Sequence, residues 1–531
     1  MWTSISAMET ESLGQRDAAN GFGALGLGAR LKEAPAPELV RSAYRLETDD
    51  SAVLWREMSL ADLAHIIMLL EVGVLPEEVG RRLLRLLLEL HAIPVEGVEL
   101  DPVLGDLYCN REGWVSRHDV EAAGWLSAGR ARREASTVAY RLAVRRRLLE
   151  LAEAMTDLAG AVLDQAAAHV ETLMPDYTYL QQAHPTTLGH YLLSFVYPML
   201  RDLERLRACF QRTNASPGGG GSINGSRLPL DRQRLADLVG FAGVIQNTRD
   251  AMWQADGPVE LMALAVALLV NLDRLAEDLM IWTTQEFGLV ELADRHARAS
   301  AIMPQKKNPY SLAFIRGVAG VMIGRQASMA SVGKTPSAQV DNRIFAYGEV
   351  PRSLDLCHDA VRLMAGVMAG LSVNTELMAR RARDGYAQAT DLAEVIMSER
   401  GLSYREAHKI VGSVVRLAVE RGMPMREIGS GLIDEAALAV LGRSVNMPPD
   451  RVALAVDPAA IVASRTGPGG AAPGPTRQML ADCRAHVLTV EEWRRTTHTV
   501  LAAAEESLVK QAAALAEPSS TNGTKPKKGR P

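Results

Sequence analysis

Residues 300–309 read Ser-Ala-Ile-Met-Pro-Gln-Lys-Lys-Asn-Pro and combine a hydroxyl, two ammonium groups and an amide. Two prolines and a polar composition exclude a buried helix here. A cationic Lys306 near Ser300 would stabilise the alkoxide form of the serine, and Asn308 could donate a hydrogen bond to a carboxylate. Residue types alone favour a solvated loop, so the order of the residues has to decide.

That order resembles the Gly-Ser-Ser-x-Met-Pro-x-Lys-x-Asn signature of the aspartase/fumarase superfamily, with Ala299 and Ala301 at its Gly and second Ser positions. The variant Met-Pro-Gln-Lys-Lys-Asn-Pro is similar to that of the argininosuccinate lyase family. The resemblance covers residues 100 to 490 and includes three further collinear segments: Asn247-Thr248-Arg249-Asp250-Ala251, Thr390-Asp391-Leu392-Ala393 and Tyr404-Arg405-Glu406-Ala407-His408.

The resemblance implies an all-α subunit of three domains around a central bundle of long helices. It implies a homotetramer whose active sites are shared between subunits. The implied reaction is a β-elimination, in which a base takes the Cβ proton of an N-substituted aspartate and the C–N bond breaks to release fumarate and an amine or guanidine. The expected partner is a small-molecule substrate, and no metal or organic cofactor is needed.

Carried over residue by residue, the resemblance makes Ser300 the catalytic base on a mobile loop. Lys306 and Asn308 would hold the substrate carboxylate, whose negative charge grows during the reaction. Such stabilisation of developing charge is usually the largest contribution to catalysis.

A second segment, Thr178-Tyr179-Leu180-Gln181-Gln182-Ala183-His184-Pro185, corresponds to Thr-His-Leu-Gln-x-Ala-Gln-Pro in the family. Thr178 and Gln181 match and are expected to bind substrate. Tyr179 replaces the family histidine, whose usual glutamate partner is Ala313 here. A phenol, with a reference pKa near 10, is a poorer proton shuttle than imidazole but can still protonate a basic leaving group. His184 is a candidate replacement acid or base, and a structural role at a helix start is equally open.

A third segment, residues 127–134, reads Ser-Ala-Gly-Arg-Ala-Arg-Arg-Glu where the family has His-Thr-Gly-Arg-Ser-Arg-Asn-Asp. Arg130 and Arg132 survive as candidate substrate-binding residues, and Arg132 has the bidentate fork that suits a carboxylate. Ala131 and Arg133 replace a hydroxyl and an amide, so the usual substrate is in doubt. Together with Lys306 and Lys307, these arginines would give a nearly neutral chain the local positive charge that a dicarboxylate site requires.

Two further stretches are candidates for the same site. Residues 334–339 read Lys-Thr-Pro-Ser-Ala-Gln where the family has a Lys-Gly-Leu-Pro-x-x-Tyr pattern, and with a one-residue gap Gln339 replaces the family's substrate-contacting Tyr. The Gly-rich residues 216–222 are either a linker or a loop whose backbone N–H groups approach an anion. The family has a Gly-rich loop at this place, which favours the second reading.

The elements that must position these residues are mostly helices. Apolar residues at helical spacing predict long helices over residues 130–151, 259–287 and 310–330. Asp119 is a candidate N-cap for the first of them, and a helix is expected to begin after Thr187. No convincing strand pattern is visible. The expected domains are a flexible N-terminus (1–30), an N-terminal helical domain (31–129), a central bundle (130–383), a C-terminal helical domain (384–516) and a disordered basic tail (517–531).

Composition bounds the function class. The chain has 531 residues, a formal net charge of −5, 47% hydrophobic and 5% aromatic residues. Near-neutral charge argues against a nucleic-acid binder, and the longest apolar run, residues 261–270, is too short to span a membrane. Four scattered cysteines without metal-ligand spacing, and an N-terminus without a signal pattern, predict a cytoplasmic protein.

Three functions remain open from the sequence. The first is an argininosuccinate lyase, and the second is a C–N lyase of the same mechanism that acts on another N-substituted aspartate. The third is a non-catalytic homologue with a structural or binding role. Retention of Ser300, Lys306 and Asn308 at the signature spacing argues against the third.

Overall fold

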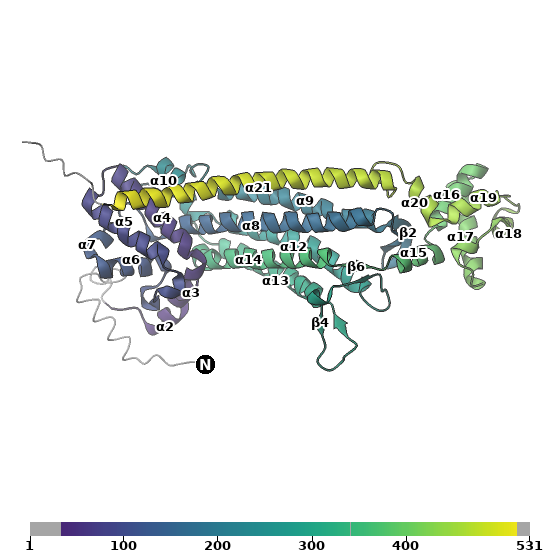
Figure 1. Ribbon diagram of the computed structural model, residues 1–531, viewed down its shortest axis with the longest axis horizontal. Coiled ribbons are helices and arrows are strands. Elements are labelled where there is room, and N and C mark those ends of the chain that lie inside the picture. The colour runs from purple at the N-terminus through teal and green to yellow at the C-terminus, as the bar shows by residue number, and fades with distance from the viewer. Residues whose placement is uncertain (1–32, 340, 518–531) are drawn as a thin grey trace, which may run out of the picture.

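Long helices lie side by side along the longest axis of the molecule and form its central bundle (Figure 1). The computed structural model describes residues 33–339 and 341–517. The predicted flexible N-terminus lies outside the described residues, as does the predicted basic tail apart from Glu517. The bundle helices are α8 (Arg132–Ala168), α9 (Leu188–Thr213), α12 (Asp256–Trp282), α13 (Tyr310–Gly333), α14 (Asp341–Ala369) and α21 (Pro473–Ala516).

Shorter helices cover one end of the bundle. They are α2 (Pro37–Leu39), the π-helical turn η2 (Val40–Tyr44), α3 (Arg45–Asp49), α4 (Ser51–Glu71), α5 (Glu77–Ala92), the 3₁₀ turns η3 (Val95–Gly97) and η4 (Pro102–Leu104), α6 (Leu107–His118), α7 (Val120–Ala123), α10 (Arg232–Leu238) and α11 (Thr248–Trp253). Asp119 accepts a hydrogen bond from the N–H of Ala122 and therefore caps α7, not the long helix. That prediction was wrong because Gly129, with φ of 67°, separates the two helices.

The other end of the bundle carries α15 (Thr375–Asp384), α16 (Ala389–Arg400), α17 (Tyr404–Glu420), the turn η6 (Met425–Glu427), α18 (Ser430–Leu441), α19 (Pro449–Val456) and α20 (Pro458–Ser464). Their buried side chains, from Leu392 to Val456, form a core separate from that of the bundle. α21 then returns along α8 and α9, and its Leu480, Val487 and Leu508 join the bundle core. The predicted domain boundaries stay predictions.

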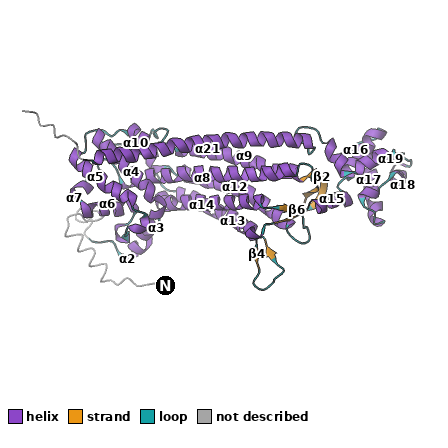
Figure 2. Ribbon diagram, viewed as in Figure 1, coloured by secondary structure: helices purple, strands orange, loops and turns teal. Residues whose placement is uncertain are grey.

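The fold is mostly helical, as expected, but strands are present where the sequence showed no strand pattern (Figure 2). In the described part of the chain, three antiparallel two-stranded ladders pair β1 (Leu173–Thr178) with β2 (Gln181–Thr187), β3 (Val290–Glu291) with β6 (Ser372–Val373), and β4 (Arg298–Ala299) with β5 (Lys307–Asn308). Most of these strands are too short to show a period-two pattern. The helix predicted to begin after Thr187 is confirmed: Thr187 Oγ1 accepts from the N–H of His190 and caps α9.

Candidate active site

The signature loop, residues 300–309, follows β4, forms the connection of the β4–β5 hairpin and includes β5. The hairpin stands out from the side of the bundle in Figure 1. Residues 301–307 are exposed, and Ser300 is partly exposed. Ser300 Oγ accepts hydrogen bonds from the backbone N–H of Met303 at 3.1 Å and of Ile302 at 3.4 Å. Hydrogen bonds donated to a hydroxyl oxygen favour its anionic form, so the loop geometry suits a serine that acts as a base.

The three polar side chains that follow differ in their surroundings. Lys306 is exposed, whereas the Lys307 ammonium lies 2.8 Å from a carboxylate oxygen of both Glu291 and Asp294. Asn308 donates from Nδ2 to the Arg298 carbonyl at 2.9 Å, across the ladder. The predicted positive charge of Lys307 is therefore already matched by two carboxylates.

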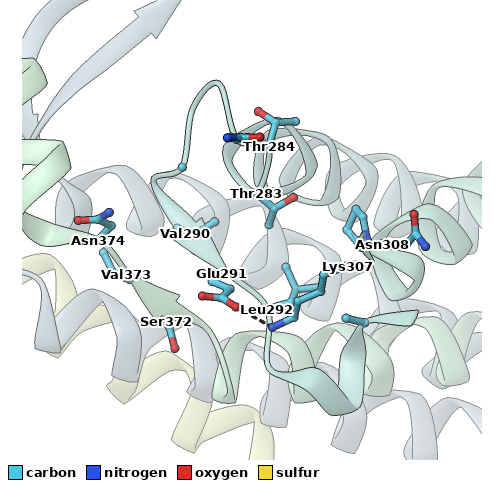
Figure 3. Close-up of a pocket in the computed structure, with 14 residues that line it drawn as sticks. Thr283, Thr284, Val290, Glu291, Leu292, Lys307, Asn308, Ser372, Val373 and Asn374 are labelled. Carbon is cyan, nitrogen blue, oxygen red and sulfur yellow. Dashed lines mark hydrogen bonds and ion pairs between the residues drawn. The ribbon is translucent and has the colours of Figure 1, made fainter. Parts of the chain in front are cut away.

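A cavity of about 530 Å³ lies at the base of the loop (Figure 3). Its wall combines the end of the loop with the β3–β6 ladder and the turn after α12, through residues that include Thr283, Thr284, Glu291, Lys307, Asn308 and Asn374. Figure 3 shows Lys307 reaching across toward Glu291, with Asn308 on the far side. The cavity is polar and open to solvent and contains one of the predicted substrate-binding residues.

The predicted substrate-binding Thr178 and Gln181 pair across the β1–β2 ladder and close a two-residue turn. Tyr179 and Leu180 form that turn with φ values of 55° and 58°. Such a turn requires positive φ at both central residues, which usually selects Asn and Gly. Tyr179 is 99% exposed, so the turn holds an aromatic side chain entirely outside the subunit at a cost in backbone strain.

His184 lies on β2 and not at a helix start. Its Nδ1 lies 3.8 Å from Oδ2 of Asp391 on α16, and Asp391 also pairs with Arg465 at 2.5 Å. Burial raises the pKa of Asp391, against the opposing effects of Arg465 and His184. His184 thus joins the hairpin to the C-terminal helices, and a part in proton transfer stays a prediction.

Arg130 lies in the core. Its Nη2 donates to Oδ1 of Asp62 at 2.8 Å, and Nε of Arg111 donates to Oδ2 of the same carboxylate at 2.9 Å. Breaking a buried ion pair leaves an uncompensated charge and costs about 3–5 kcal/mol. This partner favours a structural role for Arg130, whose substrate contact stays a prediction.

Arg132, at the start of α8, remains accessible: 44% of its side chain is exposed. Its Nε lies 3.2 Å from Oδ2 of Asp106, and Nη1 donates to Sγ of Cys109 at 3.7 Å. Asp106 also accepts from buried Arg343 at 3.4 Å. Because its side chain is exposed to this extent, Arg132 can still receive a carboxylate.

The Gly-rich residues 216–222 pack against this first turn of α8 and do not form a free linker. Gly219 and Gly221 have φ values of 74° and 67°, which require glycine. The N–H of Gly219 donates to Oε1 of Glu134 at 2.6 Å, and the N–H of Ala131 donates to the carbonyl of Gly221. Burial raises the pKa of Glu134 to about 7. Sequence reasoning passed over Glu134, although its place in the family segment signalled it.

Two further side chains lie at this end of the bundle. The Arg133 guanidinium lies 3.8 Å from the centre of the Trp253 ring, and its Nε donates to the Met252 carbonyl at 2.8 Å. Gln339 is exposed, in a loop where Ser337 accepts from Arg249 at 2.9 Å.

The structure does not bring the predicted residues together within one subunit. α8 has 37 residues. At 1.5 Å per residue it is about 55 Å long. It separates Arg130 and Arg132 at its start from the Thr178–Gln181 turn beyond its end. α13, about 36 Å long by the same rise, separates Asn308 from Gln339. Within one subunit, Arg130 and Arg132 therefore lie far from the turn, and Gln339 lies far from Asn308.

No helix among the described residues is long and apolar enough to cross a membrane. Those residues also include no group of three or more His, Cys, Asp or Glu side chains that could hold a metal ion.

Comparison with known proteins identifies relatives along most of the chain. Residues 98–324 match the lyase family model, and residues 386–462 match the model of the argininosuccinate lyase C-terminal region. The argininosuccinate lyase of Methanothermobacter thermautotrophicus is 33% identical over 427 residues, which are 80% of this chain and 91% of that one. The argininosuccinate lyase of Methanococcoides burtonii is also 33% identical, over 86% of this chain and 92% of that one.

Among solved structures, EDDS lyase in complex with formate has a TM-score of 0.82 and 31% identity, over 91% of this chain and 97% of that one. Class II fumarase from Schistosoma mansoni has a TM-score of 0.67 and 13% identity, over 81% of this chain and 96% of that one. The second likeness shows the shared fold alone.

Proposed function

The chain belongs to the argininosuccinate lyase family of the aspartase/fumarase superfamily, and we propose on that premise how its residues carry out the reaction. It is a carbon–nitrogen lyase that releases fumarate by β-elimination. The substrate is an N-substituted aspartate, either argininosuccinate or a related adduct. The observation that carries this proposal is the retained loop with Ser300 held by two backbone N–H groups and an exposed Lys306.

In the proposed mechanism, Ser300 as the alkoxide takes a proton from Cβ of the succinyl group. The electron pair moves into the adjacent carboxylate, which Lys306 and Asn308 stabilise. The pair then returns to form the C=C bond of fumarate as the C–N bond breaks. Tyr179 gives its phenolic proton to the leaving nitrogen, which departs as the neutral amine or guanidine.

The other predicted residues hold the substrate. Thr178 and Gln181 flank Tyr179 at the turn, so one hairpin would bring all three side chains to the substrate. Arg132, whose side chain is partly exposed, would bind a carboxylate, and Gln339 would contact the amine half. We assign Arg130 and His184 to support these groups, through Asp62 and Asp391 respectively.

The amine half of the substrate is best explained as different from that of argininosuccinate. Ala131 and Arg133 stand where the family has a hydroxyl and an amide, and Arg133 is held over Trp253. An added cation near this half would repel a positively charged guanidinium. A neutral or anionic amine is therefore the favoured product.

A complete site needs more than one copy, and we propose the homotetramer of the family. The distance of Arg132 from the Thr178–Gln181 turn and of Gln339 from Asn308 supports this, as does one face of α13. Gly317, Gly320 and Gly324 are exposed on that face, and a Cβ at any of them would meet no atom within 4 Å in the described part of the chain. Exposed Phe314 and Val321 lie beside them. We also propose a cytoplasmic location, in keeping with four cysteines that are all free thiols.

The test measures fumarate release by its ultraviolet absorbance, with argininosuccinate as substrate, and fumarate consumption with a panel of amines. We expect slow cleavage of argininosuccinate and faster addition of another amine. Ser300→Ala should lower turnover about 10²–10⁴-fold, as expected for loss of a general base. Ser398→Ala, a serine on α16, is the matched control. Absence of turnover in both directions would contradict the proposal and favour a non-catalytic homologue.

A further inference from the structure

The two adjacent lysines of the signature loop have different electrostatic environments. Lys307 Nζ lies 2.8 Å from Glu291 Oε1 on β3 and 2.8 Å from Asp294 Oδ1 in the following turn. These hydrogen bonds raise the pKa of Lys307, first through Asp294 and then through Glu291. Lys306 is exposed and forms no ion pair with any described residue. Of these two lysines, only Lys307 forms ion pairs with residues outside the signature loop.

Lys307 lies at the place where the loop joins the subunit. The β4–β5 ladder consists of two residue pairs, Arg298 with Asn308 and Ala299 with Lys307. Beyond this ladder, residues 301–306 are exposed. The orientation of the loop is therefore set at its base, by the ladder and by the side chains that brace it.

The interactions of the described residues at the base of the loop are of two kinds. Asn308 Nδ2 donates to the Arg298 carbonyl at 2.9 Å, and Ser311 Oγ donates to the His296 carbonyl at 2.8 Å. Both connect parts of the loop base to each other. The Lys307 ion pairs are different because they reach β3, which the β3–β6 ladder fixes to the end of the bundle. Figure 3 shows this link between Lys307 and Glu291 across the cavity.

The charge balance makes Lys307 a poor ligand for the substrate. One ammonium with two carboxylates has a net charge of −1, which would repel a dicarboxylate. Lys306, one residue away, pairs with no carboxylate among the described residues, so its ammonium group is available to the substrate.

We propose that Lys307 is a positioning residue of the lyase reaction: paired with Glu291 and Asp294, it holds the signature loop so that Ser300 and Lys306 meet the substrate. This inference rests on the proposed function, which makes Ser300 and Lys306 catalytic. It assigns different roles to two lysines that are chemically identical and adjacent in the sequence.

The first test separates kcat from KM. Lys307→Met should lower kcat about 3- to 10-fold, with KM changed less than about 2-fold, because exposed ion pairs contribute modestly. The double variant Glu291→Gln/Asp294→Asn should lose the same factor, and the triple variant should lose no more. Lys307→Arg should recover part of the activity. Lys306→Met is the matched comparison and should lower kcat by at least about 100-fold.

The outcomes distinguish the two roles. A substrate-binding Lys307 would raise KM when replaced, and removal of Glu291 and Asp294 charge would lower KM by freeing the ammonium. Additive losses in the triple variant would also overturn the proposal. Full activity of Lys306→Met and of Ser300→Ala would instead overturn the proposed function.

A second readout does not depend on activity. A protease that cuts after apolar residues can attack the bond between Ile302 and Met303, because Ile302 is 83% exposed. Lys307→Met should speed cleavage at this bond, and Lys306→Met should not. Equal cleavage rates for the two variants would show that Lys307 does not hold the loop.

Discussion

Glu134 is a buried carboxylate that holds the Gly-rich loop against the first turn of α8. It lies 1% exposed in the first turn of α8, and its Oε1 accepts from the N–H of Gly219. Burial raises its pKa to about 7, although Arg130 and Arg232 nearby oppose the shift. The charged form of Glu134 is therefore less favourable in the folded state than in the unfolded chain. Its hydrogen bond with the N–H of Gly219 nevertheless holds the Gly-rich loop.

The pKa of Glu134 predicts a pH-dependent effect of Glu134→Gln on stability. Since the folded pKa exceeds the unfolded value of 4.5, the native glutamate contributes stability below pH 4.5 that is lost as pH rises through about 7. A glutamine does not titrate. The variant should therefore gain stability relative to the native chain between pH 5 and pH 8, by up to about 3 kcal/mol. Thermal midpoints of both proteins at the two pH values check this. A midpoint difference that does not change with pH would contradict it.

At the scale of elements, the β1–β2 hairpin has a strained backbone at the turn that exposes Tyr179. Thr178 and Gln181 close the ladder, and two consecutive non-glycine residues adopt positive φ between them. Each such residue costs on the order of 1 kcal/mol. An aromatic ring that is 99% exposed gains nothing from its own subunit. The strain is consistent with a turn that delivers Tyr179 to another copy of the chain.

Leu180→Gly should relieve part of this strain. Glycine adopts a φ of 58° without steric cost, so the free energy of unfolding should rise by about 1 kcal/mol. The higher thermal midpoint of the variant is the measurement. Leu180→Ala is the control: it shortens the same exposed side chain but keeps a Cβ, so its midpoint should stay near that of the native chain. Equal gains for both variants would locate the effect in the side chain and not in the backbone.

At the scale of the whole molecule, the predicted site residues lie at opposite ends of long helices. A second copy whose α13 packs antiparallel against the first would bring the signature loop of one subunit to residues 333–339 of the other. The exposed glycines of α13 allow such close approach, since small residues let helix backbones come together. In an isolated subunit these glycines would only weaken the helix, by about 1 kcal/mol each relative to alanine.

This arrangement predicts that Gly320→Leu disrupts assembly and activity together. A Cβ at Gly320 meets no atom of another described part of the subunit within 4 Å, so the subunit should still fold. Light scattering should show a tetramer for the native chain and smaller species for the variant. Gly412→Leu on α17, also exposed and without neighbours within 4 Å, is the matched control and should remain tetrameric. A native chain that is a stable monomer would contradict shared sites.

The sequence by itself determined the family, the reaction and the long helices. Each of these depends on the local order of residues: a loop signature, collinear segments, or apolar spacing along one helix. It also placed the α9 cap at Thr187, because a cap bonds to a backbone N–H three residues away.

Only the tertiary structure decided which charges are free. Arg130 and Lys307 look like carboxylate ligands in the sequence, but Asp62 and Glu291 already pair with them. The Tyr179 turn and the short ladders were likewise invisible, since they depend on backbone conformation and on pairing between segments. The physical reason is common to all of these: an ion pair or a ladder is formed by whichever residues the fold brings within a few ångströms, and spacing along the chain does not contain that information.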